Sequence, residues 1–597
     1  MGNSSRRKCP LKQPAAAVDP APPPLPRENS RATAVVLLAF ALVFTALAVV
    51  SYRRTSATWD EPIHLTDGYV TLVRHDYRVD PEHPPLLRMW SALPLLAIGD
   101  IKLDTSPIDR TEPNVWALTT VFGFTHAFLY DGNDADRLLY AARFMTVVAG
   151  VVLGALIFFL VREWFGFPTA VVALAFYTLE PNLLAHGSLV TTDFGAALFI
   201  FATVYCLWRF RRRPTAATAA WLTLSFALGI VSKFTVLILV PIVLILLVGC
   251  VWTFRTLNVR TAIAVLALLA AASYVAIWAN YGFRYAPGPS SSWLYHFQDN
   301  RIVRQQVPRL ASIVAWVDSH HLVPNVFSQG FLLGQAKAQV RPAFVMGKYS
   351  AQGWWYYFPL AFAIKTPLSA MVLALLALIA IAVRPRADLL ERAMFLIFPV
   401  AVYMAFAINS HMNIGLRHIL PIYPFLIVLA AAGAHQLLAW RRPGAIALAV
   451  LGLFWVVEFG RAYPSVLAFF NVLVGGPRNG YRYLADSNVD WGQDLKGLKA
   501  WMDRNHVSHI DLAYFGNADP AYYGIDCAYL PPQPDFAPKT AAARQTRFPG
   551  YVAVSATSLD DVYTEKHDFY EPLRYQAPVA IIGNSIFVYW VERPWWY

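Results

Sequence analysis

The sequence predicts a polytopic α-helical membrane protein that carries a small α/β domain at its C-terminal end. Hydrophobic residues make up 57% of the chain and charged residues only 14%, whereas soluble proteins carry about 25% charged residues. Apolar runs of about 18–20 residues, the length that crosses a bilayer, recur along the chain. Because these runs lack the strict alternation of barrel strands, we expect helices to satisfy the backbone within each span.

The first 32 residues differ from everything that follows. They are rich in proline, basic and poor in large apolar side chains, which is typical of a disordered segment. We therefore expect a disordered cytoplasmic tail at 1–32. The apolar run after it has no clear A-x-A cleavage site, so we interpret it as an uncleaved first helix of a transmembrane domain covering 33–463.

The spans are predicted from the apolar runs themselves. The run 219–254 is too long for one helix, and we divide it at the polar pair Ser232–Lys233. We expect about eleven spans in all, at residues 34–51, 143–161, 168–182, 194–209, 219–232, 234–254, 261–280, 357–383, 393–408, 419–440 and 444–460.

Loop arginines predict the orientation of these spans. Cytoplasmic loops of membrane proteins are enriched in Lys and Arg, and with the N-terminus inside, every inner turn is basic. Arg53 and Arg54 lie on the outer side, against this pattern, but the positive charge of the N-terminal tail outweighs theirs. The net charge of +12 therefore indicates membrane orientation and not nucleic-acid binding. The inner arginines are Arg162, Arg209, Arg211, Arg212, Arg213, Arg255, Arg260, Arg384, Arg386, Arg392, Arg441 and Arg442.

This orientation predicts an inner cell membrane protein with two large extracytoplasmic loops, 53–142 and 281–356. Two shorter apolar pieces of the first loop, 83–99 and 114–130, carry aromatic residues and polar breaks, so we expect helices that lie in the membrane interface. Residues 464–597 change character, with one helix-like stretch and three strand-like stretches. We expect them to form an extracytoplasmic α/β domain.

Polar and ionisable groups near a membrane are costly, so those that share a face are candidates for function. The stretch TWDEPIH, residues 58–64, places two adjacent carboxylates directly after the first span. The outer set mixes carboxylates, histidines and cations, which suits a site that removes a proton and stabilises a phosphate leaving group. Its members are Asp60, Glu61, Asp80, Glu82, His83, Arg88, Glu180, His186, Asp193, Lys233, Lys365, His411, Arg417 and His418.

An ordered series of short motifs runs through this set. TWDEPIH is followed by EHPPLLR (82–88), LEPNLLAHGSLVTTDFGAALF (179–199), SKFT (232–235), WWYYFPLAFAIKTPL (354–368) and NIGLRHILPIYPFL (413–426). The series resembles the protein O-mannosyltransferase family and the related transferases that add aminoarabinose or galacturonate to lipid A. DSNVDWGQDLKGL (486–498) resembles a subgroup of bacterial members. The likeness implies a C-type glycosyltransferase fold and a polyprenyl-phosphate sugar donor.

The resemblance implies a catalytic role for three acids. Asp60 matches the general base that takes the proton of the acceptor hydroxyl, a task favoured by a pKa raised toward neutrality. One base without an enzyme nucleophile implies inversion at the anomeric carbon. Glu61 would orient the acceptor or ligate a metal, and Asp193 matches the acid of the second outer loop. The alternatives are a helix N-cap for Asp60, a solvated loop carboxylate for Glu61 and a cap of the helix at 194 for Asp193.

Five basic residues are candidates for the donor phosphate. Arginine binds phosphate through two parallel donors and lysine acts as a point charge. For Lys233 and Arg417 the alternative is snorkelling to lipid headgroups, and for Lys365 it is pairing with an acid inside the membrane. Arg88 stands where the family usually has lysine, which puts a role specific to an ammonium in doubt. The five are Arg88, Lys233, Lys365, Arg417 and His418.

The resemblance also implies a divalent metal near the site. Glu82 and His83 are the candidate ligands, with His186 nearby in the outer set, although their spacing matches no metal motif. For His83 the alternative is a hydrogen-bonded interface histidine. The implied partners are the lipid-linked donor, membrane lipids and a glycan, lipid or protein acceptor.

Two further alternatives remain open. The polar run DSNVDWGQD combines acids and amides around one tryptophan, as sugar sites do, but we favour a turn with capping residues for a helix at about 494–503. Intramembrane charges also mark transporters. Against a transporter, the chain shows no repeated halves and its acids gather on one face. A membrane-anchored binding module without catalysis would need far fewer spans.

Overall fold

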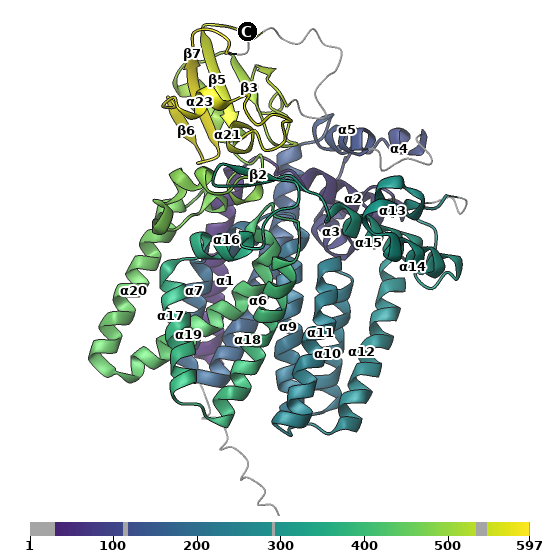
Figure 1. Cartoon of the computed structure of the whole chain (residues 1–597), viewed down its shortest axis with the longest axis vertical. Helices are drawn as coiled ribbons and strands as arrows, with labels where there is room; N and C mark the ends of the chain where they lie inside the picture. Colours follow the sequence, from purple (N-terminus) through teal and green to yellow (C-terminus); the bar gives the residue numbers. More distant parts are fainter. Residues whose placement is uncertain (1–29, 111–117, 289–292, 533–545, 596–597) are drawn as a thin grey trace, which may run out of the picture.

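The computed structural model describes residues 30–110, 118–288, 293–532 and 546–595. Long helices form a bundle, and a small domain with a β-sheet lies on one end of it (Figure 1). The predicted fold class is therefore confirmed, and the chain is a multi-pass membrane protein. Most of the tail predicted to be disordered, residues 1–29, lies outside the described residues.

All eleven apolar segments are helical, but they differ in length. Within the described residues, eight helices are long and apolar enough to cross a membrane, and a bent pair makes a ninth span. The eight are α1 (Ser30–Arg53), α6 (Ala135–Phe165), α9 (Thr192–Arg212), η2 to η3 (Phe234–Thr253), α12 (Val259–Asn280), α18 (Ala387–Ile408), η5 with α19 (Leu416–Ala439) and α20 (Arg441–Ala462). Two predicted spans are shorter apolar helices, α7 (Phe167–Thr178) and α10 (Ala216–Ile230).

The predicted division of the run 219–254 is confirmed. Helix α10 ends at Ile230, and η2 (Phe234–Ile238) begins after Lys233, followed by α11 (Leu239–Val248) and η3 (Gly249–Thr253). The Ser232 hydroxyl donates to the carbonyl oxygen of Gly229 at 2.6 Å, which satisfies a free carbonyl at the helix end. The break leaves the Lys233 side chain at the end of a span.

The predicted span 357–383 is a bent pair. Helices α16 (Tyr357–Lys365) and α17 (Leu368–Val383) meet at 109°. Pro367 causes the break, because proline has no N–H group and disfavours helical backbone in the residue before it. The Asn471 amide donates to the freed carbonyl of Thr366 at 2.9 Å.

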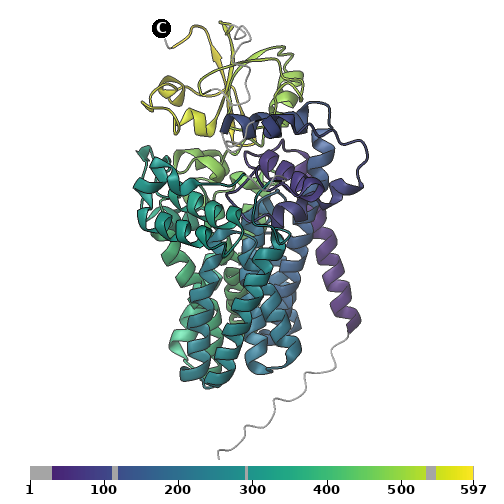
Figure 2. The same cartoon turned by 90° about the vertical axis from the view of Figure 1, so that its right-hand side faces the viewer.

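The two large loops gather at the same end of the bundle as the small domain (Figure 2). The first, residues 54–134, contains α2 (Glu61–Arg74), α3 (Leu86–Ala92), η1 (Leu93–Ala97), α4 (Ser106–Arg110) and α5 (Leu118–Tyr130). The second, residues 281–356, contains η4 (Phe297–Asp299), α13 (Arg301–Gln306), α14 (Pro308–Ser319), α15 (Asn325–Lys337), β1 (Ala343–Val345) and β2 (Lys348–Ser350).

The interface prediction for 114–130 was wrong for the described part of that segment. Helix α5 lies between α2 and the C-terminal domain, and its Phe128 and Leu129 side chains are buried. The Tyr130 ring is 5.3 Å from the Tyr522 ring of the small domain. The apolar face is covered by protein rather than by lipid. Residues 114–117 lie outside the described residues.

The C-terminal domain contains a five-stranded mixed sheet. Strands pair in the order β4-β3-β5-β7-β6, with β3 parallel to β4 and β5, and β7 antiparallel to β5 and β6. The predicted helix is α21 (Leu495–Arg504), and two of the three strand-like stretches hold β3 (Ile510–Ala513) and β5 (Gly550–Ser555). The third stretch forms two strands, β6 (Ala580–Ile582) and β7 (Ile586–Val591). The sequence did not predict β4 (Cys527–Tyr529) or the short helices α22 (Ala556–Leu559) and α23 (Glu571–Arg574).

Short turns connect the bundle to this domain. After α20 the chain passes through 3₁₀ turns at Val466–Ala468, Val472–Val474, Pro477–Arg482 and Asp486–Asn488. The loops α6–α7, α9–α10, α17–α18 and α19–α20 lie at the opposite end of the bundle. The ends of α1, α6 and α9 that face the C-terminal domain therefore share one side with both large loops, and α8 (Pro181–His186) packs against α1 and α9.

Candidate functional site

Four of the predicted site residues converge where the first large loop meets the bundle. Asp60 precedes α2, Asp193 lies in the first turn of α9, Lys233 precedes η2 and Arg417 lies in η5 (Leu416–Ile422). The Arg417 Nη1 atom is 2.7 Å from Asp60 Oδ2 and 3.4 Å from Asp193 Oδ2. Lys233 Nζ is 2.5 Å from Asp193 Oδ1. Two carboxylates and two cations thus form one continuous network.

The structure assigns neither Asp60 nor Asp193 to helix capping. Asp60 stands at the N-cap position of α2, yet its side chain makes no cap hydrogen bond. Helix α9 begins at Thr192, and the Asp193 carboxylate points to Lys233 and Arg417. The Asp60 side chain is 24% exposed, whereas that of Asp193 is 4% exposed. Asp60 is therefore the acid that an incoming molecule can reach.

The expected rise in the pKa of Asp60 is corrected by the structure. Burial by itself raises the pKa of this carboxyl, but the neighbouring Arg417 guanidinium and His64 favour the charged form, and together they hold the pKa below its ordinary value. Asp60 is thus an ionised carboxylate that is paired with a cation. It can accept a proton, but its basicity is limited while Arg417 stays in contact.

Several buried polar atoms around this network have no hydrogen-bond partner within the described residues. Most buried polar side-chain atoms in proteins have a partner, so a group of exceptions indicates a place for a ligand or water. The two arginine Nε atoms of the group can only donate, and its hydroxyls and ring nitrogens can donate or accept, so the group is able to hold an anionic ligand. The atoms are Thr58 Oγ1, His83 Nδ1, His186 Nδ1, Thr191 Oγ1, Arg341 Nε, Arg417 Nε and His418 Nε2.

Glu61 is fully used in a structural ion pair with Arg143 of α6. Arg143 Nε and Nη2 donate to the two carboxylate oxygens at 2.8 and 2.5 Å, and both side chains are fully buried. The backbone N–H groups of Thr58 and Val190 donate to the same oxygens at 2.8 and 2.9 Å. Burial raises the pKa of Glu61, and Arg143 together with these N–H groups lowers it below its ordinary value. The carboxylate is therefore not a solvated loop group.

Arg88 does not face the Asp60 network. Its Nη1 atom is 2.9 Å from Asp67 Oδ2 and 2.7 Å from Asp80 Oδ2, and its Nη2 atom donates to the carbonyl oxygen of His83. The side chain is 3% exposed. The expected phosphate contact is corrected, because the cation is committed to two acids of its own loop.

Lys365 is likewise separate from the network. Its ammonium donates to the carbonyl oxygens of Leu467 at 3.1 Å and Asn488 at 2.5 Å and lies 4.4 Å from the centre of the Phe470 ring. Two carbonyls and an aromatic face replace the water that a buried cation loses. The predicted phosphate contact is corrected, and Lys365 instead links the bend after α16 to the turns that follow α20.

The proposed metal ligands do not converge. Glu82 pairs with Lys337 of α15, and no three His, Cys, Asp or Glu side chains in the described ranges form a group that could hold a metal. His83 has one ring nitrogen buried without a partner. Burial and the nearby Lys233 ammonium lower the pKa of His83 to about 3, so its ring is neutral. A neutral ring offers a hydrogen-bond donor beside the network.

His418 and His186 border the same network. His418 follows Arg417 in η5, and both Lys233 and Asp193 lie within its electrostatic range. His186 ends α8, is buried, and lies 6.2 Å from the Trp491 ring. The sequence placed His418 among the phosphate candidates and His186 in the outer set of polar residues. The local sequence around His186 does not indicate that its side chain is buried.

The capping interpretation of DSNVDWGQD was wrong, because Asp494 stands before α21 without a side-chain cap bond. Asp486 and Asp490 are instead held by the C-terminal domain through Tyr563 and Thr557. Burial raises the pKa of Asp490 to about 7. This segment, residues 486–494, also reaches the network, because the Trp491 ring lies 4.2 Å from the Arg417 guanidinium carbon.

Sequence reasoning missed two arginines. Arg143 was treated as the start of a span, although a charged residue next to an apolar run is itself a signal for a buried partner. Arg341, in the second large loop, has a buried Nε atom without a partner and lies within electrostatic range of Arg417. No local motif marks it, because only the fold brings residue 341 beside residue 417.

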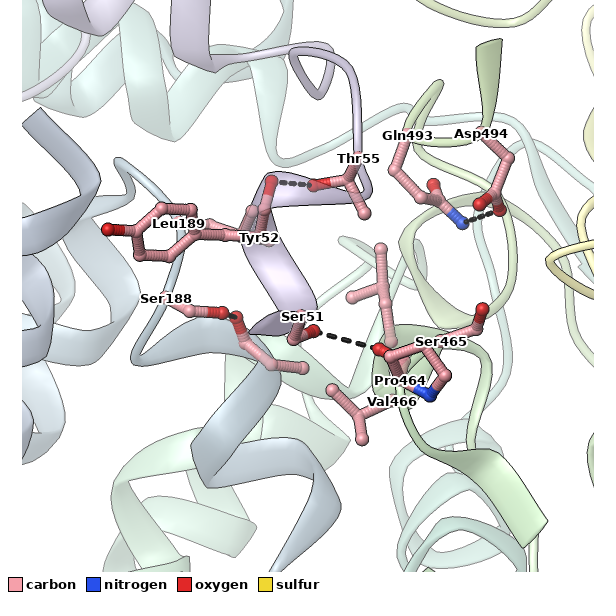
Figure 3. A pocket seen from close by; sticks show the side chains of 12 residues that line it. Ser51, Tyr52, Thr55, Ser188, Leu189, Pro464, Ser465, Val466, Gln493 and Asp494 are labelled. Carbon is pink, nitrogen blue, oxygen red and sulfur yellow. Dashed lines mark hydrogen bonds between the residues drawn. The ribbon is translucent and has the colours of Figure 1, made fainter. Parts of the chain in front are cut away.

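A small cavity of about 20 Å³ lies between the end of α1 and the turns that follow α20 (Figure 3). It is bounded by the end of α1, the turn after α8, residues 464–467 and residues 493–494. The Ser51 hydroxyl donates to the carbonyl of Pro464 across it at 2.8 Å. Neither Asp60, Asp193, Lys233 nor Arg417 lines it, so this cavity is distinct from the network.

Comparison with known proteins identifies part of the chain. Residues 136–278 match the family described as dolichyl-phosphate-mannose-protein mannosyltransferase. The resemblance to the lipid-carrier-dependent glycosyltransferases is confirmed over these residues. The matched segment includes Arg143, Asp193 and Lys233 but not Asp60 or Arg417, and it supports a glycosyltransferase. No curated protein matches the chain.

Three solved structures show a similar course of the chain. ArnT from Cupriavidus metallidurans, bound to undecaprenyl phosphate, is 12% identical, and the match covers 94% of this chain and 98% of that one with a TM-score of 0.44. The protein O-mannosyltransferase Pmt1–Pmt2 complex of S. cerevisiae, bound to its sugar donor, is 15% identical over 46% of this chain and 36% of that one, with a TM-score of 0.32. The oligosaccharyltransferase of Archaeoglobus fulgidus, tethered to an acceptor peptide, is 10% identical over 72% and 55%, with a TM-score of 0.44. At these identities and scores the likeness assigns no activity to this chain.

Proposed function

We propose that this protein transfers a sugar from a polyprenyl-phosphate donor to an acceptor hydroxyl, with inversion at the anomeric carbon. The observation that carries the proposal is the network of Asp60, Asp193, Lys233 and Arg417, bordered by buried polar atoms that have no hydrogen-bond partner among the residues that the structure describes. Such a site can hold a phosphate and keep a carboxylate beside it. The family match over residues 136–278 supports the same reaction class.

The donor phosphate would bind between Arg417, Lys233 and His418. Arg417 uses Nη1 for the two carboxylates, and its buried Nε has no partner, so the guanidinium still has donors for an anion. Lys233 adds a positive charge from the opposite side of Asp193. Arg341 approaches from the second large loop and adds a further cation. The unpartnered Nε atoms of Arg341 and Arg417, which can only donate, favour the phosphate over a neutral ligand.

Asp60 would act as the general base. Its carboxylate takes the proton of the acceptor hydroxyl while the hydroxyl oxygen bonds to the anomeric carbon, and the bond from that carbon to the phosphate oxygen breaks. The polyprenyl phosphate leaves with the bonding electrons, and its charge is stabilised by Arg417 and Lys233. One attack from the face opposite the leaving group inverts the centre.

The pairing of Asp60 with Arg417 suggests that the donor activates the base. In the unliganded site the guanidinium favours the charged carboxylate and lowers the pKa of Asp60. A bound phosphate shares the charge of Arg417, so the pKa of Asp60 rises toward the working pH. The base would then become effective only when a donor is present, which limits unproductive proton transfer.

The site would face the extracytoplasmic side of the inner cell membrane. The arginine-bearing loops α6–α7, α9–α10, α17–α18 and α19–α20 lie at the other end of the bundle, and such loops are typically cytoplasmic. Helix α1 begins at that same end, which supports a cytoplasmic N-terminus. The donor would enter from the bilayer, and a glycan, lipid or protein acceptor would enter from the aqueous side below the C-terminal domain.

A transfer assay with the full-length chain tests this function. The protein is reconstituted in lipid vesicles with a panel of radiolabelled polyprenyl-phosphate sugars and acceptors extracted from membranes. Label is expected to move from the lipid to the acceptor fraction. Absence of transfer with the whole panel, by a protein that remains folded, would remove the proposal.

Replacement of Arg417 by lysine tests the phosphate-binding role of this side chain. Lysine keeps the charge but loses the planar fork, and a hydrogen bond to a charged group is worth about 1.5–3 kcal/mol. Donor binding should weaken roughly 10- to 100-fold, and the KM for the donor should rise with it. The matched control is Arg442→Lys, an exposed arginine at the other end of the bundle. An unchanged KM for the donor in Arg417→Lys would contradict the phosphate role.

A further inference from the structure

Trp491 connects the C-terminal end of the chain to the catalytic network. Its ring lies 4.2 Å from the guanidinium carbon of Arg417, and the residue is 1% exposed. We propose that Trp491 is a positioning residue that holds the Arg417 guanidinium between Asp60 and Asp193. The catalytic meaning of this role rests on the proposed function, whereas the contact itself does not.

The aromatic ring restrains the one side chain that touches both acids. A guanidinium over an indole face is held by electrostatic attraction and by stacking of the two planes, and the interaction is stronger when water is excluded. The Arg417 side chain is only 10% exposed. Its Nε atom has no partner in the described part of the chain, so the ring and the two carboxylates orient it there. Without the ring, the guanidinium can turn away from Asp60.

The same segment fixes the backbone beneath Arg417. The N–H group of Leu416 donates to Asn488 Oδ1 at 3.0 Å, and the Ser487 hydroxyl donates to the carbonyl oxygen of Ile414 at 2.8 Å. Residues on both sides of Trp491 therefore set the position of the chain that carries Arg417. The Trp491 ring and these two hydrogen bonds therefore both restrain the position of Arg417.

The segment also fixes the other member of the ion pair. The N–H group of Trp59, next to Asp60, donates to the carbonyl oxygen of Trp491 at 2.9 Å. The N–H group of Ser56 donates to the carbonyl oxygen of Gln493 at 2.8 Å. The segment that holds both Asp60 and Arg417 in place is therefore distant from Asp60 in the sequence, since positions 60 and 491 are 431 residues apart.

The C-terminal domain holds the segment in this register. The N–H group of Thr557 donates to Asp490 Oδ2 at 3.1 Å, and the Tyr514 hydroxyl donates to the carbonyl oxygen of Gly492 at 2.5 Å. Gly492 has φ +85°, and a Cβ atom there would lie 2.7 Å from the Cα atom of Gly516. Only glycine fits this close approach. Trp491 is therefore one route by which the domain acts on the site; the other is Trp59, next to Asp60, whose carbonyl oxygen accepts from the Asn517 amide at 2.9 Å.

Replacement of Trp491 by leucine and by phenylalanine tests the proposal in the transfer assay. Asp60 is faced by Arg417, His64 and Asp193, and Arg417 is faced by Asp60, Asp193 and Asp486. If Arg417 turns away, the pKa of Asp60 rises. The acid limb of the kcat/KM profile should then move to higher pH by about one unit, so that kcat/KM falls by up to about 10-fold relative to the native protein at pH values on that limb. Phenylalanine retains an aromatic face and should recover most of the rate.

Two controls separate positioning from a general loss of structure. Trp501→Leu removes a buried tryptophan of α21 whose ring packs 5.3 Å from that of Tyr551, within the C-terminal domain, and it should leave the pH profile unchanged. A double-mutant cycle of Trp491→Leu with Arg417→Lys, read as thermal unfolding temperature, should be non-additive. This cycle needs no activity, so it tests the contact even if the transfer assay fails for the native protein. An additive cycle, or a rate loss without a shift of the acid limb, would overturn the proposal.

Discussion

Asp60→Asn is expected to lower sugar transfer about 10²- to 10⁴-fold, the usual contribution of a general base. Asparagine has the same shape but cannot take the proton of the acceptor hydroxyl. Its amide oxygen can still accept a hydrogen bond from Arg417 Nη1, which lies 2.7 Å from Asp60 Oδ2 in the native protein. The fold should therefore survive, and donor binding should change far less than the rate.

The measurement is a single-turnover transfer rate at saturating donor, with donor binding measured in parallel. The control is Asp131→Asn, because Asp131 is an exposed carboxylate of the same large loop, just after α5. This control should transfer sugar at the native rate. A fully active Asp60→Asn protein would show that another group takes the proton, and the catalytic assignment would fail.

Arg143→Ala is expected to have the largest effect on stability. The change removes one partner of a fully buried ion pair, and breaking such a pair costs about 3–5 kcal/mol because the remaining charge is left without compensation. Arg143 also donates to the carbonyl oxygens of Tyr52 and Ser56 at 2.9 and 2.8 Å. It therefore fixes the turn between α1 and Asp60, so activity should fall together with stability.

Thermal unfolding in lipid nanodiscs measures this effect. Arg137→Ala is the matched control, since Arg137 is exposed on the same helix two turns earlier, and it should unfold at the native temperature. Arg143→Lys keeps the positive charge but loses the two parallel donors of the guanidinium. Its unfolding temperature should therefore lie between those of Arg143→Ala and Arg137→Ala. If Arg143→Ala unfolds like the native protein, Glu61 must find another partner and the pair is not what holds the turn.

The local sequence predicted the parts of the site that depend on motifs and topology. Asp60, Asp193, Lys233 and Arg417 each stand at the end of an apolar run, and the spacing of the runs places these ends on one side of the bundle. Their convergence could therefore be expected. The order of the motifs also indicated the reaction class, which the family match over residues 136–278 supports.

The partners of individual charges were less predictable. Arg88 and Lys365 carry the right charge in the right region, yet they bind acids or carbonyls of their own surroundings. A cation near a membrane takes the nearest group that replaces water, and that group is decided by packing. For the same reason the expected rise in the pKa of Asp60 was wrong, since Arg417 is its closest neighbour.

The amino-acid sequence by itself determined a helical membrane bundle, a C-terminal sheet and the end of the bundle at which ionisable residues gather. These properties follow from hydrophobic length, periodicity and loop charge, which act over about 20 residues. Only the tertiary structure decided that Glu61 belongs to Arg143, that Trp491 stacks on Arg417 and that Arg341 approaches the network. Such contacts join residues from 74 (417 and 491) to 82 (61 and 143) positions apart, and they exist only after the bundle, the loops and the C-terminal domain have packed together.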